Sequence, residues 1–211
     1  MKTIFVTGIG TDVGKTIVSA IITEALEADY WKPVQAGGPG TDNETVATLV
    51  TNKKTIVHPE IYKFKLAASP HISARNENQR IDPERIIEAH SQLKTDNDWL
   101  VVEGAGGLMV PLNENSFVSD LIGKMEAKVV IVSRNYLGSI NHSLLTSRTL
   151  ASMGIHIAGW IFNDQYLDYE DEIAHWSGYP KIGSVPLTDN PDATFIKVQA
   201  AKLKDALIDW A

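Results

Sequence analysis

The sequence predicts an α/β fold in which a mostly parallel sheet carries helices on both faces. Segments expected to be strands alternate with segments expected to be helices along the whole chain of 211 residues. The expected strands are continuous apolar runs, which is typical of parallel strands that are buried on both faces. A chain of this length can bury a sizeable core, so we expect residues 1–211 to form a single domain.

Short apolar runs bounded by glycine, proline, asparagine or charged residues are expected to be strands. Pro33 biases Lys32 away from helical backbone, which favours an extended segment there. Glycines make residues 35–41 and 104–107 loops, and residues 56–70 form a poorly patterned connection. The expected strands cover residues 3–7, 30–34, 99–103, 129–133, 156–162 and 182–185.

Apolar residues at helical spacing and recognisable caps predict the helices. Residues 16–28 carry a regular apolar stripe, and Asp42 is expected to cap a helix over 44–50. Asp82, followed by proline, opens the next helix. The further expected helices cover residues 83–93, 120–125, 140–153 with Ser139 or Asn141 as its cap, 169–176, and a last segment that Asn190 caps and that ends near Trp210.

Composition narrows the class of protein. Hydrophobic residues make up 44% of the chain and charged residues 21%, as in ordinary globular proteins. The net charge of −7 argues against a general binder of nucleic acid or of acidic membranes. The absence of cysteine excludes disulfides, thiolate catalysis and zinc–thiolate sites. We see no signal peptide and no apolar run long enough to span a bilayer, so we expect a cytoplasmic protein.

The first expected strand leads into a glycine-rich turn and then into a helix. Gly8 and Gly14 bound the turn, and Lys15 and Thr16 follow it. Backbone N–H groups of such a turn cradle phosphates, the lysine reaches the outer phosphates, and the hydroxyl usually binds magnesium. Five residues separate the glycines where four are usual, so this is a variant phosphate-binding loop (P-loop). The order of strand, turn, lysine, hydroxyl and helix favours it over a turn that binds nothing.

Functional side chains are expected at one edge of the sheet, because ligands of parallel sheets collect at the carboxyl ends of the strands. The expected strands end at Gly8, Lys32, Glu103, Ser133, Asn163 and Pro186.

Two carboxylates and a lysine are candidates for work beside the phosphates. Glu103 stands where a P-loop protein often has its second magnesium contact, next to Thr16; its alternative role is to cap the following loop. Asp42 is a candidate third ligand or a simple helix cap, and Glu44 competes with it. Lys32 could stabilise a transferring phosphoryl group, although a solvent-facing lysine is more common.

Other strand and helix ends offer binding groups. Asn163 and Asp164 could read the edge of a nucleotide base, or they could form an ordinary turn. The helix start between Ser139 and Asn141 would attract a carboxylate.

Several segments carry a wider resemblance. They are residues 6–16 around the P-loop, 31–35 (Trp-Lys-Pro-Val-Gln), 69–71 (Ser-Pro-His), 102–107 (Val-Glu-Gly-Ala-Gly-Gly), 137–142 (Leu-Gly-Ser-Ile-Asn-His) and 159–164 (Gly-Trp-Ile-Phe-Asn-Asp). In this order they resemble the dethiobiotin synthase family, the ligases of biotin synthesis, over nearly the whole chain. The resemblance implies a single-domain P-loop NTPase-like fold and a homodimer.

The resemblance also implies a reaction and its participants. The substrates would be 7,8-diaminopelargonate, CO2 or bicarbonate, and ATP with Mg²⁺, without nucleic acid or membrane partners. One amine captures CO2 as a carbamate, and the carbamate attacks the γ-phosphate. The second amine closes on the mixed anhydride to give the cyclic urea of dethiobiotin.

By the same resemblance, specific residues receive roles. Lys15, Lys32 and Thr11 would be catalytic, and Thr16, Asp42 and Glu103 would hold the magnesium ion. The nucleotide would contact Asp12, Val13, Gly14, Lys15, Thr16, Ile17, Asp42, Glu103, Gly104, Ala105, Gly106, Asn163, Asp164, Pro186, Leu187 and Thr188. The substrate would contact Lys32, Ala36, Ser69 and Gly106, and its distal carboxylate would meet Ser139, Ile140 and Asn141 of a second subunit.

Two positions depart from the family pattern. The family often has serine or threonine where this chain has Ala36, so a hydroxyl contact is lost, or Gln35 or a backbone amide replaces it. The acidic residue after the glycine-rich loop is hard to align, so the choice of Asp42 over Glu44 is a judgement.

Other functions compete with this interpretation. The runner-up is a nucleotide switch of the partitioning or septum-placement type, but its extra loop lysine corresponds to Gly10 here. An amidotransferase-type ligase of the cobyric acid group would need a glutaminase domain and a cysteine nucleophile. A catalytically silent homologue would not be expected to retain Lys15, Thr16, Lys32 and Glu103.

Overall fold

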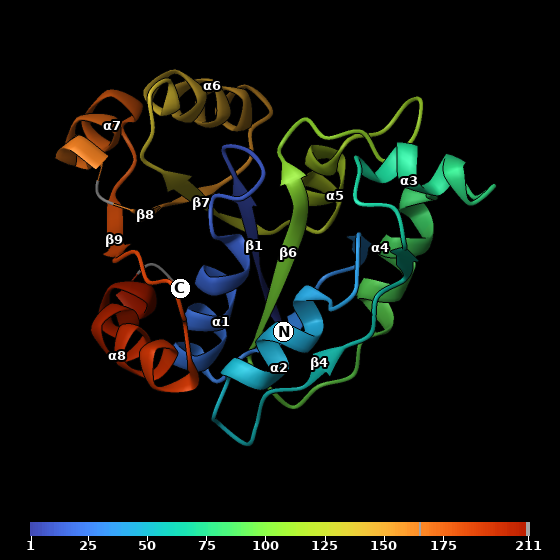
Figure 1. Cartoon of the computed structure of the whole chain (residues 1–211), viewed down its shortest axis with the longest axis horizontal. Helices are drawn as coiled ribbons and strands as arrows, with labels where there is room; N and C mark the ends of the chain where they lie inside the picture. Colours follow the sequence, from blue (N-terminus) through green and yellow to red (C-terminus); the bar gives the residue numbers. More distant parts are fainter. Residues whose placement is uncertain (165, 210–211) are drawn as a thin grey trace.

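The computed structural model describes residues 1–164 and 166–209, and a parallel sheet runs through its centre (Figure 1). Within these residues the main sheet has seven strands, all parallel to their neighbours. Their spatial order is β4 (Val57–His58), β2 (Asp29–Trp31), β6 (Trp99–Gly107), β1 (Lys2–Gly8), β7 (Lys128–Arg134), β8 (Ile157–Asn163) and β9 (Lys181–Val185). The predicted α/β class and parallel sheet are confirmed.

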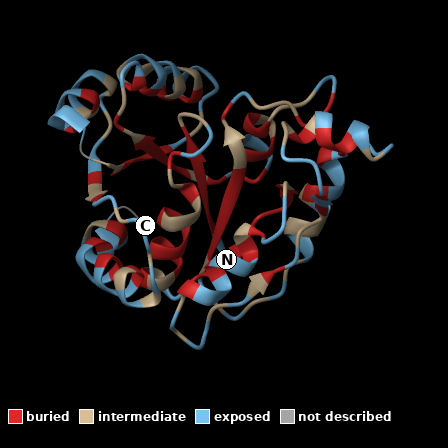
Figure 2. Cartoon of the chain, in the orientation of Figure 1, coloured by how far each residue is buried: buried red, intermediate tan, exposed pale blue. Residues whose placement is uncertain are grey.

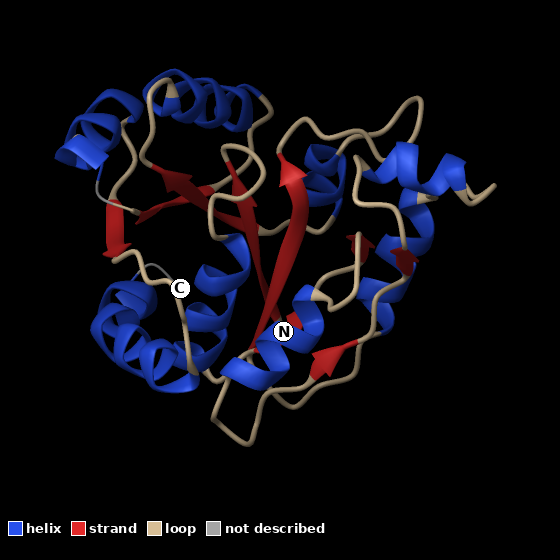
Figure 3. Cartoon of the chain, in the orientation of Figure 1, coloured by secondary structure: helices blue, strands red, loops and turns tan. Residues whose placement is uncertain are grey.

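Helices cover both faces of this sheet (Figure 3). One face packs against α1 (Lys15–Leu26), α2 (Asp42–Leu49) and α8 (Ala193–Asp209). The other packs against α3 (Pro70–Asn76), α4 (Pro83–Gln92), α5 (Val118–Lys124), α6 (Ser139–Ser152) and α7 (Glu170–Ser177). A short 3-10 turn, η1 (Tyr166–Asp168), precedes α7. In the described part of the chain, none of the helices has the length and apolar character that crossing a bilayer requires.

Successive strand residues point to opposite faces, and the sheet is buried on both sides (Figure 2). On β2, Tyr30 belongs to the core beneath α1, whereas Trp31 belongs to the core on the opposite face. The continuous apolar runs in the sequence are thus explained by burial on both faces.

The expected strand over residues 30–34 is wrong in one respect, because the chain leaves the main sheet after Trp31. Pro33 has no N–H to continue a ladder, and its carbonyl accepts from the backbone N–H groups of Ile61 and Tyr62. The chain then forms β3 (Val34–Ala36), which pairs in parallel with β5 (Tyr62–Phe64) outside the main sheet. These strands, like β4, are too short to give a periodic signal, so they were not expected within the loop 35–41 and the connection 56–70.

Several predicted helix starts are also corrected. Asp42 does not cap α2, because the Thr41 hydroxyl accepts from the N–H of Glu44 and the Glu44 carboxylate accepts from the N–H of Thr41. This reciprocal pair needs a threonine three residues before a glutamate, as in this sequence. Asp82 does cap α4, as predicted, by accepting from the N–H of Glu84.

The start of α6 and the start of α8 differ from expectation as well. Gly138 is the N-cap of α6, so neither Ser139 nor Asn141 has that role. Ahead of α8, the Asp192 carboxylate accepts from the N–H of Phe195, so Asp192 caps this helix in place of Asn190. The expected helix end near Trp210 lies outside the described residues.

Asp29 holds the end of the sheet opposite to the predicted site. Its buried carboxylate accepts from Ile56 N at 3.0 Å and Asn97 Nδ2 at 2.6 Å, and lies 2.9 Å from His58 Nε2. Burial alone would raise the pKa of this carboxyl, but hydrogen bonds from Thr95 and these groups outweigh it and lower the pKa. The ionised carboxylate therefore stabilises the join between β2 and the segment that precedes β4.

We expect Asp29→Asn to lower the free energy of unfolding at pH 7 by about 1–3 kcal/mol, because buried donors lose a charged acceptor. A carboxyl with a lowered pKa stabilises the fold above its ordinary pKa of 3.8 and loses that effect as the pH falls below it. The difference between the variant and the wild type should therefore shrink below that pH. Urea unfolding across this range measures it, with the exposed Asp205→Asn as control; equal stability of both variants at pH 7 would contradict the prediction.

Candidate active site

The carboxyl ends of the strands meet at one edge, as predicted, and the loop from Gly8 to Thr16 stands there between two cavities of the described chain. Thr11 and Asp12 line both cavities. The smaller, of about 810 Å³, is also lined by Lys15, Thr16, Ile17, Lys32, Ala36, Asp42, Ser69, Glu103, Ala105 and Gly106. The larger, of about 1020 Å³, is also lined by Ile9, Val13, Arg134, Tyr136, Leu137, His142, Asp164, Pro186 and Leu187.

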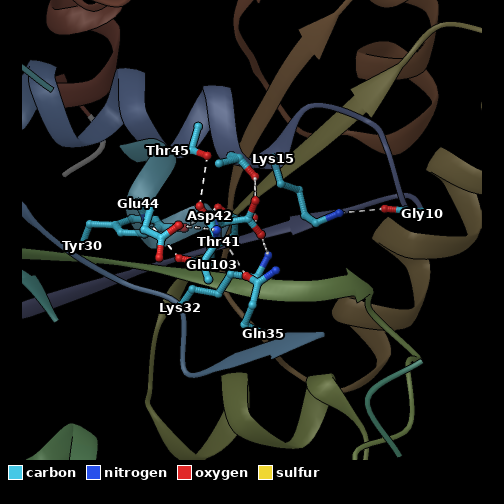
Figure 4. Close-up of polar contacts among 11 residues, drawn as sticks. Gly10, Lys15, Tyr30, Lys32, Gln35, Thr41, Asp42, Glu44, Thr45 and Glu103 are labelled. Carbon is cyan, nitrogen blue, oxygen red and sulfur yellow. Dashed lines mark hydrogen bonds and ion pairs between the residues drawn. The ribbon is translucent and has the colours of Figure 1, made fainter. Parts of the chain in front are cut away.

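The P-loop lysine is folded back onto its own loop. Lys15 Nζ donates to the carbonyl oxygen of Gly10 at 3.0 Å (Figure 4), and the side chain is buried. Burial lowers the pKa of Lys15, and the nearby Glu103 carboxylate offsets this only in part. A buried ammonium whose charge is only partly balanced is suited to receive an anion in the cavity.

Lys32 joins two carboxylates at the centre of the smaller cavity. Its ammonium forms an ion pair with Asp42 Oδ2 and another, of 2.9 Å, with Glu103 Oε1. Lys32 is 6% exposed, so it is not the solvent-facing lysine that is more common in proteins. Burial would lower the pKa of Lys32, but the attraction of Glu103 and Asp42 outweighs it and raises the pKa. The lysine is therefore charged at neutral pH.

The Thr16 hydroxyl lies in the same cluster, 3.0 Å from Asp42 Oδ1 and 3.0 Å from Glu103 Oε1. These oxygens are of the hard type that Mg²⁺ prefers, and magnesium in nucleotide sites usually has only one or two carboxylate ligands besides water and phosphate. Among the described residues, no group of three or more histidine, aspartate or glutamate side chains could hold a metal. The three residues therefore fit a magnesium ion that shares its ligands with a nucleotide.

Glu44 has a different position from Asp42. Its carboxylate accepts from the backbone N–H of Thr41 in the helix cap and lies 3.7 Å from the exposed Lys63. Glu44 does not line either cavity, whereas Asp42 contacts both Thr16 and Lys32. The geometry thus favours Asp42 over Glu44 as the acidic residue of the site.

The other expected substrate and loop residues divide into two groups. Ala36, Ser69 and Gly106 line the cavity of Lys32, and the Ser69 hydroxyl lies 3.0 Å from His71 Nδ1. Gly104 lies outside the lining of this cavity, in β6, where an added Cβ would be 2.9 Å from the Phe5 ring. Strand β6 continues through Gly107 rather than turning at Gly104.

The expected base-contacting residues stand along the larger cavity. Asn163 Nδ2 donates to the carbonyl of Val13 at 3.2 Å, and Asp164 forms an ion pair of 3.2 Å with Arg134. Pro186 and Leu187 line the cavity, but Thr188 does not.

The residues expected to meet the distal carboxylate lie apart from this cluster. Ser139 is buried, and its hydroxyl is 2.7 Å from the Tyr169 hydroxyl. Ser139, Ile140 and Asn141 line neither cavity, although His142 lines the larger one. Within one chain the structure therefore does not bring them to Lys32.

Sequence reasoning missed two side chains of the cluster (Figure 4). The Tyr30 hydroxyl donates to Glu103 Oε2 at 2.7 Å, and Gln35 Oε1 accepts from the backbone N–H of Asp42 at 3.3 Å. Tyr30 looked like one more apolar strand residue. A signal was present, because Tyr30 stands two residues before Lys32 and so points to the same face of an extended chain.

The parallel sheet, the glycine-rich loop after β1 and the Lys-Thr pair at the start of α1 define the class of this protein. It is a P-loop nucleotide-binding protein.

Comparison with known proteins gives the family. The model of a family described as an AAA domain matches residues 2–193. The ATP-dependent dethiobiotin synthetase BioD of Cytophaga hutchinsonii is 44% identical over 206 residues, which are 97% of this chain and 98% of that protein. The protein of the same name from Christiangramia forsetii is 41% identical over 99% of both chains. The chain belongs to the dethiobiotin synthetase family, which confirms the resemblance seen in its motifs.

Among solved structures, the Pyrococcus furiosus cell division ATPase MinD is similar, with a TM-score of 0.60 and coverage of 100% of both chains. The identity is 14%, so this likeness shows the fold alone.

The conformation of the P-loop leads to a prediction about its glycines. Gly14 has a φ of +89°, and an added Cβ would lie 2.0 Å from Asn163 Nδ2. Gly10 has no atom within 4 Å of such a Cβ. We expect Gly14→Ala to lower the free energy of unfolding by more than about 2 kcal/mol, from the left-handed backbone and the clash together. Gly10→Ala, the matched control, should stay within about 0.5 kcal/mol of the wild type.

Urea unfolding of the nucleotide-free chain measures both changes. Adding Asn163→Ala to Gly14→Ala should recover the part of the loss that comes from the clash but not the backbone strain. Equal stability of the Gly14 and Gly10 variants would contradict this description of the loop.

Proposed function

We propose that this chain is an ATP-dependent dethiobiotin synthetase that acts as a single ligase domain. It would convert 7,8-diaminopelargonate, CO2 and ATP into dethiobiotin, ADP and phosphate. Family membership supports this activity. The structural observation that carries the proposal is that Lys15 and Lys32, both buried, line one cavity together with Thr16, Asp42 and Glu103.

The proposed reaction has three steps. One substrate amine attacks CO2 and loses a proton, which gives a carbamate. A carbamate oxygen attacks the γ-phosphorus of ATP, and ADP leaves. The second amine then attacks the carbonyl carbon of the mixed anhydride and phosphate leaves, which closes the cyclic urea. Negative charge gathers on the carbamate and then on the transferring phosphoryl group, so fixed positive charge at both places lowers the barrier.

This chain's residues match those needs. We assign Lys15 to the phosphates, since its ammonium needs only to turn from the Gly10 carbonyl to the cavity. We assign Lys32 to the carbamate and the transferring phosphoryl group, because it lines the cavity opposite the P-loop. Thr11, which lines both cavities, would donate to the carbamate.

Thr16, Asp42 and Glu103 would hold Mg²⁺. When bound, the ion would neutralise charge on the nucleotide phosphates. The backbone N–H groups of residues 12–17 would surround those phosphates, as the N-terminus of a helix does for anions. Residues 104–106 would lie against the substrate side of the nucleotide.

The base would occupy the larger cavity, bounded by Asn163, Asp164 and residues 186–188. Pro186 and Leu187 give that wall apolar surface, and Asp164 gives a hydrogen-bond acceptor. The Asn163 amide is already bound to the P-loop carbonyl of Val13, so it would hold the loop and the base together.

The site would be completed by a second copy of the chain. Ser139, Ile140 and Asn141 lie outside the cavity of Lys32 in their own chain, so they would serve the neighbouring subunit. The first turn of α6 has backbone N–H groups without intrahelical partners, which favour a carboxylate. Leu137, directly before this turn, is 92% exposed, as a residue of a subunit interface would be in a single chain.

The proposal predicts that phosphate release from ATP and Mg²⁺ depends on both diaminopelargonate and bicarbonate. Product mass should show the cyclic urea in amounts equal to the phosphate released. Release that ignores both substrates would contradict the proposal. Stimulation by a protein or a surface instead would favour a nucleotide switch, whose fold this chain shares.

Lys32→Ala tests the proposed mechanism. We expect turnover to fall by about two to three orders of magnitude, because charge on the transferring group loses a fixed cation. Nucleotide affinity should remain within a few-fold, because the P-loop is intact. The exposed Lys53→Ala is the matched control and should leave turnover unchanged. Initial rates and nucleotide titrations measure both properties; near-normal turnover of the Lys32 variant would remove Lys32 from the mechanism.

A further inference from the structure

Tyr30 and Glu103 come from neighbouring strands and point to the same face of the sheet. In the register of β2 and β6, Tyr30 stands opposite Val101. Glu103 is two residues further along β6, and side chains two apart lie on the same face. The strand advances about 6.6 Å over those two residues, and the tyrosine side chain spans this distance along the sheet to the carboxylate.

The contact is buried and charged. Tyr30 is 0% exposed and Glu103 is 1% exposed, and the hydroxyl donates to Glu103 Oε2 at 2.7 Å. Burial, followed by the negative charge of Glu103, raises the pKa of the Tyr30 hydroxyl well above its ordinary value. The hydroxyl is therefore a donor throughout the neutral range. A hydrogen bond from a neutral donor to a buried carboxylate is among the stronger ones in proteins.

The two oxygens of Glu103 have different neighbours. Among the described residues, Thr16 and Lys32 donate to Oε1, whereas Tyr30 donates to Oε2. Thr16 and Lys32 line the cavity, but Tyr30 lines neither cavity. Ligands that enter the cavity can displace the first two contacts, whereas the Tyr30 contact stays beneath the site (Figure 4).

We propose that Tyr30 is a positioning residue, whose hydroxyl fixes the orientation of the Glu103 carboxylate and so presents Oε1 to the magnesium side of the cavity. This inference rests on the metal role given to Glu103 in the proposed function. Without the hydroxyl, Oε2 is a buried acceptor with no partner, and the carboxylate can turn to share both oxygens with Lys32. The partner of a metal-binding carboxylate commonly changes metal affinity or activity by 10–100-fold.

The test uses Tyr30→Phe in the full-length protein, with metal binding as the readout. Mn²⁺ replaces Mg²⁺ as the probe, in the presence of ADP and without the other substrates, and electron paramagnetic resonance measures free Mn²⁺. We expect the Kd for Mn²⁺ to rise about tenfold or more, with the affinity for ADP in the absence of metal unchanged. In steady-state assays, raising Mg²⁺ should restore turnover, and the KM for diaminopelargonate should stay constant.

Tyr62→Phe is the matched control. Tyr62 is also buried, and its hydroxyl accepts from the backbone N–H of Asp82, away from both cavities. This variant loses a buried hydroxyl too, so it measures the general effect on stability by urea unfolding. We expect it to bind Mn²⁺ as the wild type does.

The outcomes separate the inference from the function on which it rests. If the wild type binds Mn²⁺ with ADP no better than free ADP does, the proposed metal site fails, and the inference fails with it. If the wild type binds Mn²⁺ and Tyr30→Phe binds it equally well, the proposed function stands and the positioning role is overturned. Equal weakening in both tyrosine variants would also overturn it, because the effect would then be one of stability.

Discussion

The pairing of Lys32 with Asp42 and Glu103 is the interaction on which the rest of the site depends. A buried ammonium is stable only when opposite charges meet it, and buried carboxylates need the same. Three features of the fold bring these groups together: β2 ends at Trp31 so that Lys32 can turn inward, Thr41 caps α2 so that Asp42 stays free, and β6 carries Glu103 past both. The site is thus assembled from separate parts of the chain.

Much of the fold could be predicted from the sequence because its signals are local. Apolar runs show strands buried on both faces, and the spacing of Gly14, Lys15 and Thr16 shows the turn from β1 into α1. Parallel strands place their carboxyl ends together, so the edge that gathers Lys32 and Glu103 followed from the class of fold. The family resemblance rested on these same segments, and the comparisons confirm it.

The remainder depended on contacts that no local pattern carries. The burial of Lys32 is set by carboxylates from α2 and β6, and a lysine after a short strand gives no sign of it. Tyr30 matches an apolar strand residue until the register with β6 is known. Strands as short as β3 and β5 have no periodicity, and their pairing depends on where Pro33 directs the chain. The Thr41 cap was visible in the sequence as a threonine three residues before Glu44, but Asp42 offered a competing pattern.

The contact between Asn163 and the P-loop has a consequence for how the chain acquires its shape. The Asn163 amide donates to the carbonyl of Val13 and packs against Gly14, across a separation of 150 residues. Contacts of such long sequence separation form late in folding, because the intervening chain must first be ordered. During synthesis the glycine-rich loop leaves the ribosome early, yet it waits for β8 before it has its final form. The first segment to be made is therefore among the last to become able to bind an anion.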